Sequence, residues 1–505
     1  MKKQLLFLIP LAALLSITAC GGNNNDSKPS ESTASIASSS EPEPEVGLTD
    51  CEKPNMELDF QEVERTCMVE DEIKNYVDAM EAQEKTLEKP YHFSPLYGPS
   101  DYSVLGSKPE KVNNANYGRS GKEYPSNETG GVDACQYLKE QGGKDKNVPI
   151  VVKWDASNES YDENTKVKFW STKDFSDLRE TSVTVNDGVA SVSLANLFVA
   201  TKYRIQVFNG DDVSQGFEFD TADYPRTMSM GDIPNVRDIG GYMTSYGVRT
   251  NQGLIYRGFE IEDKEGGHGV KYNAKCEAVH QEVMKIGYEI DLRKSTELNG
   301  RTASALGPIG EGDDAKDVSY KCLTLVSYEN FLKEDSYKNL PEVFSIIANA
   351  DERHVYFHCW GGADRTGMLA FFINAICGVS YTDLIEDFEI TSETNNMRCH
   401  LHNSSSARYA TFLNAFANEW TGFDASETIN ENCYKWLVEV AEVNPDVIED
   451  IRQIMIPGYY ADMPQNIPTY TASEGTEEDE FGIWNPAVED SNVRCNYKRK
   501  DELLA

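Results

Sequence analysis

A cysteine and an arginine six positions apart, set between a short β-rich run and a long apolar run, constrain this chain most. Residues 355–357 are Val-Tyr-Phe, residues 358–366 read His-Cys-Trp-Gly-Gly-Ala-Asp-Arg-Thr, and residues 367–377 are almost wholly apolar. This pattern predicts a strand, a glycine-rich loop and a buried helix in direct succession. Further strand-like (289–293) and helix-like (340–350) runs indicate an α/β domain from about residue 228.

The loop has the composition of a phosphate site. A loop of this length can fold around a tetrahedral anion with its backbone N–H groups pointing inward, and the following helix adds its positive end. Gly361 and Gly362 permit a close backbone approach, and the Arg365 guanidinium offers a bidentate fork to two oxygens. The same field favours a thiolate at Cys359, toward which Thr366 can donate its hydroxyl.

Three motifs in order carry a family resemblance. The run His-Cys-x5-Arg-Thr-Gly resembles the signature of protein tyrosine and dual-specificity phosphatases. The other two are Asn-Val-Arg-Asp-Ile-Gly-Gly-Tyr at 235–242, with Tyr-Arg-Gly at 256–258, and Asp-Leu-Arg at 291–293, with Glu297. Together they resemble the bacterial secreted tyrosine phosphatases over about residues 230–460. The resemblance implies a cysteine-phosphatase fold at 228–462, with a central sheet flanked by helices and no metal or other cofactor.

The resemblance also implies roles for single residues. Cys359 is the expected nucleophile and Arg365 the group that binds the phosphoryl oxygens. Asp364 is the first candidate for the general acid and Asp291 the second, although Asp291 also suits an internal ion pair with Arg293. The preceding loop offers further acid candidates at Asp313, Asp314 and Asp317. Substrate-binding residues are expected in the loop and in the opening motif: His358, Trp360, Gly361, Gly362, Ala363 and Arg237. The alternative for His358 is to order the loop by hydrogen bonding, and the alternative for Arg237 is to build the fold.

The expected substrate is a phosphotyrosine-containing protein or peptide, with phosphoserine and phosphothreonine as further substrates. A phosphoinositide or inositol polyphosphate is the alternative, because the same loop serves those esters. Relatives that accept phosphoinositides often carry a lysine where this chain has Ala363, which weakens that alternative. A different class of function is a surface binding protein in which the phosphatase activity is secondary.

Net charge excludes one class of partner. The 505 residues include 47 Lys and Arg against 84 Asp and Glu, a formal charge of −37. Because nucleic acids are bound through clustered basic side chains, no nucleic-acid partner is expected.

The N-terminus indicates export. Residues 1–20 combine a short basic start, an apolar run and small residues before Cys20, as in a bacterial lipoprotein signal peptide. Cys20 is therefore the expected lipidation site, which would anchor the chain to the outer face of the bacterial cell membrane. Of the 11 cysteines, export makes disulfides available to those other than Cys20 and Cys359, for example Cys51 with Cys67 or Cys399 with Cys433.

The remaining segments differ in composition. Residues 21–47 are rich in Asn, Ser, Pro and Glu and predict a disordered tether. Residues 48–146 are partly helical in pattern, particularly 62–89, and suit a spacer or a wrap over a neighbouring domain. Short alternating runs at 147–224, with a hairpin signal at Asp187-Gly188, resemble a β-sandwich of the fibronectin type III or immunoglobulin kind. Residues 463–505 predict an acidic, solvated extension.

Overall fold

The computed structural model describes residues 50–61 and residues 149–465, the latter with gaps of which 392–411 is the longest. Among these residues, no helix is long and apolar enough to cross a membrane. The signal peptide, Cys20, the 21–47 tether, the helical prediction at 62–89 and the acidic extension after residue 465 lie outside the described residues, so these expectations stay predictions.

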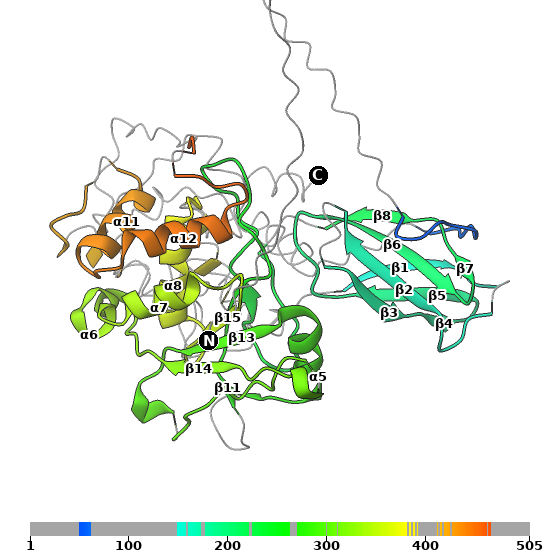
Figure 1. Cartoon of the computed structure of the whole chain (residues 1–505), viewed down its shortest axis with the longest axis horizontal. Coiled ribbons are helices and arrows are strands. Elements are labelled where there is room, and N and C mark those ends of the chain that lie inside the picture. Colours follow the sequence, from blue (N-terminus) through cyan, green and yellow to red (C-terminus); the bar gives the residue numbers. More distant parts are fainter. Residues whose placement is uncertain are drawn as a thin grey trace, which may run out of the picture. The chain divides into compact units, whose positions relative to one another are not determined.

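Residues 150–220 form two antiparallel sheets that share one hydrophobic core, and they are called the β-domain below (Figure 1). One sheet has the order β1-β5-β4 and the other β3-β2-β6-β7, with β8 also paired to β6. The strands are β1 (Ile150–Asp155), β2 (Lys166–Ser171), β3 (Arg179–Ser182), β4 (Thr184–Asn186), β5 (Val189–Leu194), β6 (Lys202–Asn209), β7 (Asp212–Val213) and β8 (Phe217–Asp220).

Alternation of side chains explains these strands. In β1, Val152 and Trp154 are fully buried in the shared core while Lys153 between them is only partly buried. Asp187 and Gly188 form the predicted turn between the paired strands β4 and β5, with φ angles of 50° and 80°. Both residue types tolerate positive φ, which is what a tight hairpin turn requires. The likeness to fibronectin type III domains stays a prediction.

Residues 50–61 pack on the β-domain. Met56 forms a β-bridge with Ser214, Phe60 forms one with Trp154, and Leu58 between them is buried in the core of the β-domain. The side-chain amide of Gln215 also bonds to the backbone of Leu58 in both directions. This part of the 48–146 region therefore wraps a neighbouring domain, which is one of the two roles that the sequence suggested.

The second fold unit, called the α/β domain below, is built on a five-stranded sheet of order β14-β13-β15-β10-β9. Its strands are β9 (Arg237–Asp238), β10 (Ile255–Gly258), β13 (Ile286–Asp291), β14 (Ser319–Cys322) and β15 (His354–His358), and a separate parallel pair consists of β11 (Ile261–Glu262) and β12 (Val270–Lys271). Strands β14, β13, β15 and β10 are parallel, and β9 is antiparallel to β10.

The register places three carboxyl ends at one edge of the sheet. His358, the last residue of β15, pairs with Gly258 at the end of β10 and with Asp291 at the end of β13. In open parallel sheets ligands bind beyond this edge. The predicted phosphate loop begins directly after His358 and so starts at that position.

Both faces of the sheet are covered. Val355 and Phe357 of β15 belong to a large core with the helices that follow, whereas Tyr356 between them belongs to a second core on the opposite face. Strand β10 behaves in the same way, because Ile255 and Tyr256 fall in different cores. Parallel strands buried on both faces are typical of α/β domains.

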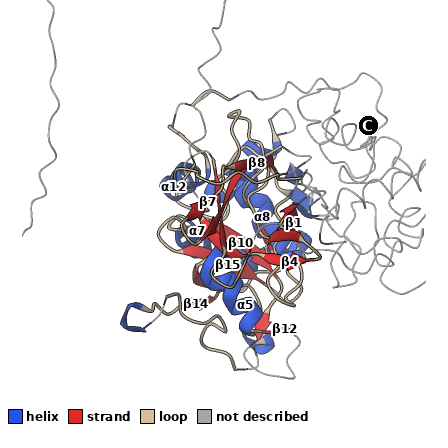
Figure 2. Ribbon diagram, turned by 90° about the vertical axis from the view of Figure 1, so that its right-hand side faces the viewer, coloured by secondary structure: helices blue, strands red, loops and turns tan. Residues whose placement is uncertain are grey.

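The helical segments are α5 (Ala274–Val279), η2 (His280–Met284), η3 (Ser295–Glu297), η4 (Gly312–Asp314), η5 (Tyr328–Leu332), α6 (Glu334–Tyr337), α7 (Leu340–Ile347), α8 (Asp364–Ile376), α11 (Ile429–Glu439) and α12 (Pro445–Met455). Helix α8 contacts β10, β15 and α11. Helix α12 contacts α7 (Figure 2). Caps fix two of the starts: Thr428 and Glu431 form a capping box on α11, and Asn444 caps α12.

The predicted helices at 340–350 and 367–377 are confirmed as α7 and α8. Helix α8 is buried over nearly its whole length, which explains why its apolar residues show no single stripe. Each suggested disulfide has one described cysteine, Cys51 or Cys433. Both of these are free thiols, so the suggested disulfides are wrong.

Candidate active site

The predicted strand, loop and helix are present as β15, the segment 359–363 and α8, and residues 359–365 are called the Cys359 loop below. Gly362 has φ of 65°, and a Cβ built there would lie 2.3 Å from the Gly258 carbonyl oxygen. No side chain fits that distance, so a glycine is required where the loop passes the end of β10.

Every carbonyl from Cys359 to Ala363 accepts a hydrogen bond from outside the loop. The donors are, in order, the His358 ring (3.0 Å), the Glu260 backbone (3.2 Å), the Asn235 amide (2.9 Å) and, for both Gly362 and Ala363, the Arg257 guanidinium (2.9 and 3.4 Å). In a trans peptide the N–H points opposite to the carbonyl. The loop therefore turns its N–H groups toward its own centre, an arrangement that suits an anion.

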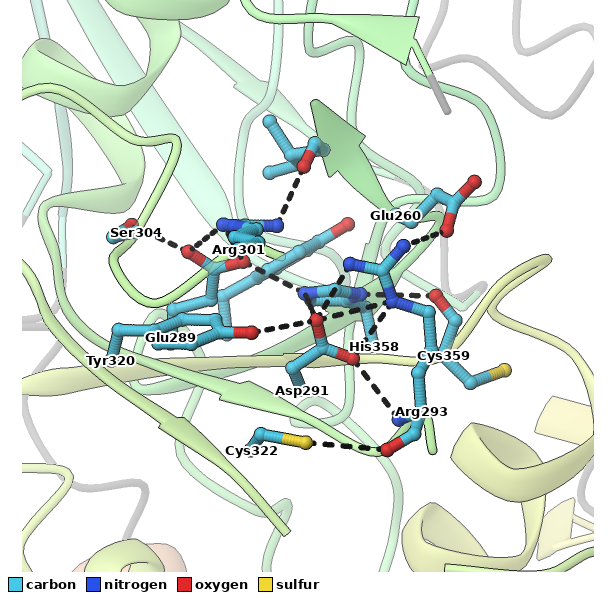
Figure 3. Close-up of polar contacts among 12 residues, drawn as sticks. Glu260, Glu289, Asp291, Arg293, Arg301, Ser304, Tyr320, Cys322, His358 and Cys359 are labelled. Carbon is cyan, nitrogen blue, oxygen red and sulfur yellow. Dashed lines mark hydrogen bonds and ion pairs between the residues drawn. The ribbon is translucent and has the colours of Figure 1, made fainter. Parts of the chain in front are cut away.

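Cys359 lies at the start of this loop and is 4% exposed. The ring before it is held at both nitrogens: His358 Nδ1 donates to the Cys359 carbonyl, and Nε2 donates to the Glu289 carboxylate at 2.7 Å (Figure 3). Burial lowers the pKa of His358, but Asp291 and Glu289 outweigh it and the net direction is upward. An imidazolium with two acceptors therefore orders the loop. Because His358 is fully buried and both ring nitrogens are bonded within the protein, its predicted substrate contact is corrected to this structural role.

Arg365 is oriented by a residue to which the sequence gave no role. Its two terminal nitrogens donate to the two oxygens of Glu297 at 2.8 and 3.0 Å. Burial lowers the pKa of Arg365, whereas the Glu297 bonds and the proximity of Cys359 and Asp364 raise it, with a net upward shift. Because a guanidinium has five N–H donors, the pair with Glu297 leaves three for a phosphoryl group.

Asp364 and Thr366 occupy the first turn of α8. The Asp364 carboxylate accepts a hydrogen bond from the Tyr328 hydroxyl, and its side chain is partly exposed. Thr366 is buried, and its hydroxyl is one of the described side-chain groups that have no hydrogen-bond partner. Asp364 therefore lies at the surface of the loop and Thr366 beneath it, and the catalytic roles expected of the two residues stay predictions.

Asp291 does not suit the second acid role that the sequence gave it. Its carboxylate is fully buried and bonds to Arg293 at 2.7–3.1 Å and to the Tyr320 hydroxyl at 3.1 Å (Figure 3). Burial alone raises the pKa of Asp291, but His358 and Arg293 lower it to about 2. A carboxylate that stays ionised cannot give a proton at neutral pH, so the ion pair with Arg293 is its role and the acid assignment is wrong.

Arg237 is also not a substrate-binding residue. It is 1% exposed and bonds to Asp387 at 3.1 Å, to Thr391 at 3.1 Å and to the side chain of Asn235. Asn235 in turn holds the Gly361 carbonyl. The opening motif therefore supports the Cys359 loop from behind, and the prediction that Arg237 contacts the ligand is corrected to a structural role.

The other predicted contact residues are distributed around the loop. Trp360 is 41% exposed beside the nucleophile and Ala363 is buried as the residue that precedes α8. Asp314 and Asp317 are exposed in the segment before β14, and no described contact joins them to the loop; the side chain of Asp313 lies outside the described residues.

Besides Glu297 and Asn235, sequence reasoning gave no role to the supporting side chains Tyr328, Asp387, Arg257 and Glu289. Asp387 binds both Arg237 and Arg257, and Glu289 binds His358, Arg301 and Ser304 (Figure 3). Arg257 belongs to the Tyr-Arg-Gly run at 256–258, to which the sequence gave no role. Its burial and the neighbouring charge of Arg237 lower its pKa to about 10. A polar residue in an otherwise apolar strand, such as Glu289, was the available signal.

The comparisons with known proteins agree with this geometry. Residues 228–457 match the model of the tyrosine phosphatase family. A protein of Cupriavidus necator whose name assigns it provisionally to the tyrosine-protein phosphatases is 26% identical over 194 residues, which is 35% of this chain and 66% of that relative. The chain thus spans just under two thirds of the relative's length. The family match and the relative's name support a phosphatase, and hence a hydrolase.

Proposed function

We propose that this protein hydrolyses phosphate monoesters of tyrosine residues through a covalent phosphocysteine, without a metal ion. The single observation that supports this most is that the carbonyls of residues 359–363 are all held from outside the Cys359 loop. From this we infer that the N–H groups face the centre of the loop. That preorganised ring stands around the position that a phosphoryl group must take to meet Cys359.

The proposed reaction has two steps. The Cys359 thiolate attacks phosphorus, the bond to the tyrosine oxygen breaks, and Asp364 gives its proton to the departing oxygen. Water then attacks the phosphocysteine, Asp364 takes a proton from it, and the Cys359 thiolate leaves. Arg365 and the loop N–H groups neutralise charge on the equatorial oxygens in both steps, and the buried Thr366 hydroxyl stabilises the departing sulfur.

The decisive experiment compares the chain with Cys359→Ser on an aryl phosphate in reductant and EDTA. We expect hydrolysis that chelator does not affect and that the variant lacks. Trapping of radiolabelled phosphate on the wild type, and none on the variant, would establish the covalent step. Activity that EDTA abolishes, or that persists in Cys359→Ser, would overturn the mechanism.

The alternative substrate, a polyanionic inositol phosphate, has less support. Glu297 and Asp364 add negative charge beside Arg365, and Ala363 contributes no cation. Phosphate release from phytate and from a phosphotyrosine peptide at equal concentration separates the two proposals, with the peptide expected to react faster. A phosphoserine peptide in the same assay tests dual specificity.

We also propose that the chain is a lipoprotein anchored at the outer face of the cell membrane, with the β-domain as an accessory module of the fibronectin type III kind. The support is the signal sequence that ends at Cys20 and the two sheets around one core. Labelling with a radioactive fatty acid in the native host, lost in Cys20→Ala, tests the anchor. Surface binding that survived Cys359→Ser and required residues 50–220 would indicate a separate binding function of the β-domain.

A further inference from the structure

Tyr328 belongs to a separate element, η5, and lies next to Asp364. Its hydroxyl donates a hydrogen bond to the Asp364 carboxylate. We propose that Tyr328 is a positioning residue that fixes the Asp364 carboxyl group for proton transfer to the leaving oxygen. This inference rests on the proposed function, because it assigns Asp364 as the acid.

The backbone at Tyr328 supports a dedicated placement. Its φ of 58° lies in the left-handed region, which bulky side chains rarely adopt. Such strain persists where the surrounding structure determines it, often beside active sites. The strained turn directs a tyrosine hydroxyl to the one residue of the Cys359 loop whose proposed task is to move a proton.

Contacts on both sides hold the segment that carries Tyr328. On one side the Leu325 backbone bonds to Leu292 at 3.2 Å, and the Thr324 hydroxyl bonds to the Arg293 carbonyl at 2.9 Å, just beyond the end of β13. On the other side the Phe331 ring, fully buried, stacks on Phe372 of α8 with centroids 5.3 Å apart.

One of these anchors ties the Tyr328 segment to α8, the helix that Asp364 begins. Asp364 begins α8, and η5 packs on α8 three residues after Tyr328. The hydroxyl and the carboxylate are therefore held at a fixed relative position by the core and not by flexible side chains alone. With one carboxylate oxygen bonded to Tyr328, the plane of the carboxyl group is set before the substrate binds.

The test uses leaving groups of different acidity in the full-length chain. Dinitrophenolate leaves without a proton, whereas phenolate needs one from the acid. We expect Tyr328→Phe to lower kcat/KM for phenyl phosphate by about tenfold and to change kcat/KM for 2,4-dinitrophenyl phosphate by less than about twofold. The comparison uses kcat/KM because kcat also contains the hydrolysis of the phosphocysteine, in which Asp364 acts on both esters alike. Because the ratio of the two rates is taken within one preparation, it does not depend on the folded fraction.

Two further variants complete the test. Tyr459→Phe removes a similar tyrosine–carboxylate bond, to Glu449 at 2.6 Å, and should leave the ratio unchanged. In an Asp364→Asn background, Tyr328→Phe should have no further effect on the ratio. Equal slowing of both esters, or no slowing in Tyr328→Phe, overturns the positioning role while the phosphatase proposal stands. An inactive wild type on both esters overturns the proposed function and this inference together.

Discussion

Glu297 orients the guanidinium group of Arg365. The two side chains are bound through both guanidinium terminal nitrogens, and the pKa of Glu297 is lowered mainly by its bonds to Arg365. A long arginine side chain left without this partner would sample several rotamers, and part of the phosphate-binding energy would be spent on ordering it. The pair is therefore a means of preorganisation.

Glu297→Gln should lower kcat/KM for aryl phosphates about tenfold, because one arm of the bidentate pair and its charge are lost. Steady-state kinetics and inhibition by vanadate measure the effect. The matched control is Glu342→Gln, which removes the carboxylate that pairs with exposed Lys321 and should change neither quantity. Tighter vanadate binding in Glu297→Gln would contradict the positioning role, since it would mean that Glu297 competes with the anion.

The raised pKa of Glu260 predicts that the free energy of unfolding depends on pH. Its side chain is 1% exposed, one of its oxygens bonds to Arg293, and burial, opposed by Arg293, raises its pKa to about 7. Between the unfolded pKa of about 4.5 and pH 7 the folded state then binds more protons than the unfolded chain. This contribution to the free energy of unfolding is present below about pH 4.5 and is lost as pH rises to about 7.

The measurement is urea unfolding of wild type and Glu260→Gln at pH 5 and pH 8. We expect wild type to lose roughly 1–3 kcal/mol more than the variant over this interval, because glutamine does not titrate. Glu419→Gln, at an exposed pair with Lys333, is the control and should follow wild type. Parallel stability profiles for wild type and Glu260→Gln would contradict the prediction.

At the scale of the element, the Cys359 loop combines a backbone that only glycine allows with donors from three residues that are distant in the sequence. Gly362→Ala places a methyl group against the Gly258 carbonyl at a positive φ. We expect a loss of at least about 2 kcal/mol of stability and more than about 100-fold of kcat/KM, since the loop must shift. Thermal melts and aryl phosphate hydrolysis test this.

Gly247→Ala is the matched control for that prediction. Gly247 has φ of 76°, and a Cβ there would have open space around it. The control therefore carries the conformational cost of about 1 kcal/mol without the steric clash. Equal effects of the two substitutions would mean that the close approach to β10 does not shape the loop.

Local pattern explains why this element could be predicted. The strand, the loop and the buried helix are consecutive in the sequence, and the phosphate-loop chemistry needs only residues 358–366. The supporting residues could not be found in that way, because Tyr328 and Asp364 are 36 positions apart and Arg257 and Asp387 are 130 apart. Such contacts depend on the topology of the sheet and on the packing of α8.

The motif at 235–242 shows how a correct pattern led to a wrong role. The motif belongs to the family resemblance, from which a substrate contact was expected for Arg237. In the structure the charge of Arg237 is satisfied by Asp387, and it is Asn235 that bonds to the loop. The sequence contains no sign of Asp387 as the partner, since a lone aspartate in a helical run usually faces solvent.

At the scale of the whole molecule, hydrogen bonds connect the β-domain with the α/β domain. The loop between β5 and β6 supplies the contacts: Asn196 bonds with the backbone of Ser229 in both directions, and Val199 does so with the side chain of Gln252. Arg226, in the segment between the two domains, donates to the carbonyls of Asn196 and Leu197. The β-domain is thus bonded to the same part of the α/β domain that contains the opening motif.

Arg226 makes this connection testable. Its guanidinium also donates to Asp238 at 2.7 Å, both side chains are fully buried, and Asp238 in turn accepts from the backbone of Gly240 and Gly253. Arg226→Met keeps the length of the side chain but leaves the Asp238 charge buried without its partner and two carbonyls of the β-domain without a donor. Removal of one member of a buried pair costs about 3–5 kcal/mol.

We therefore expect Arg226→Met to lower the stability of the whole chain by about that amount and to reduce phosphatase activity, although the residue is not among those of the Cys359 loop. Arg204→Met is the control, because Arg204 makes comparable ion pairs with Asp50 and Glu218 that are partly exposed and confined to the β-domain side. Differential scanning calorimetry should show one cooperative transition that moves in Arg226→Met. Two transitions in wild type, with only the β-domain transition shifted in Arg226→Met, would contradict this prediction. The domains would then unfold independently, and the loss of the Arg226–Asp238 pair would not affect the Cys359 loop.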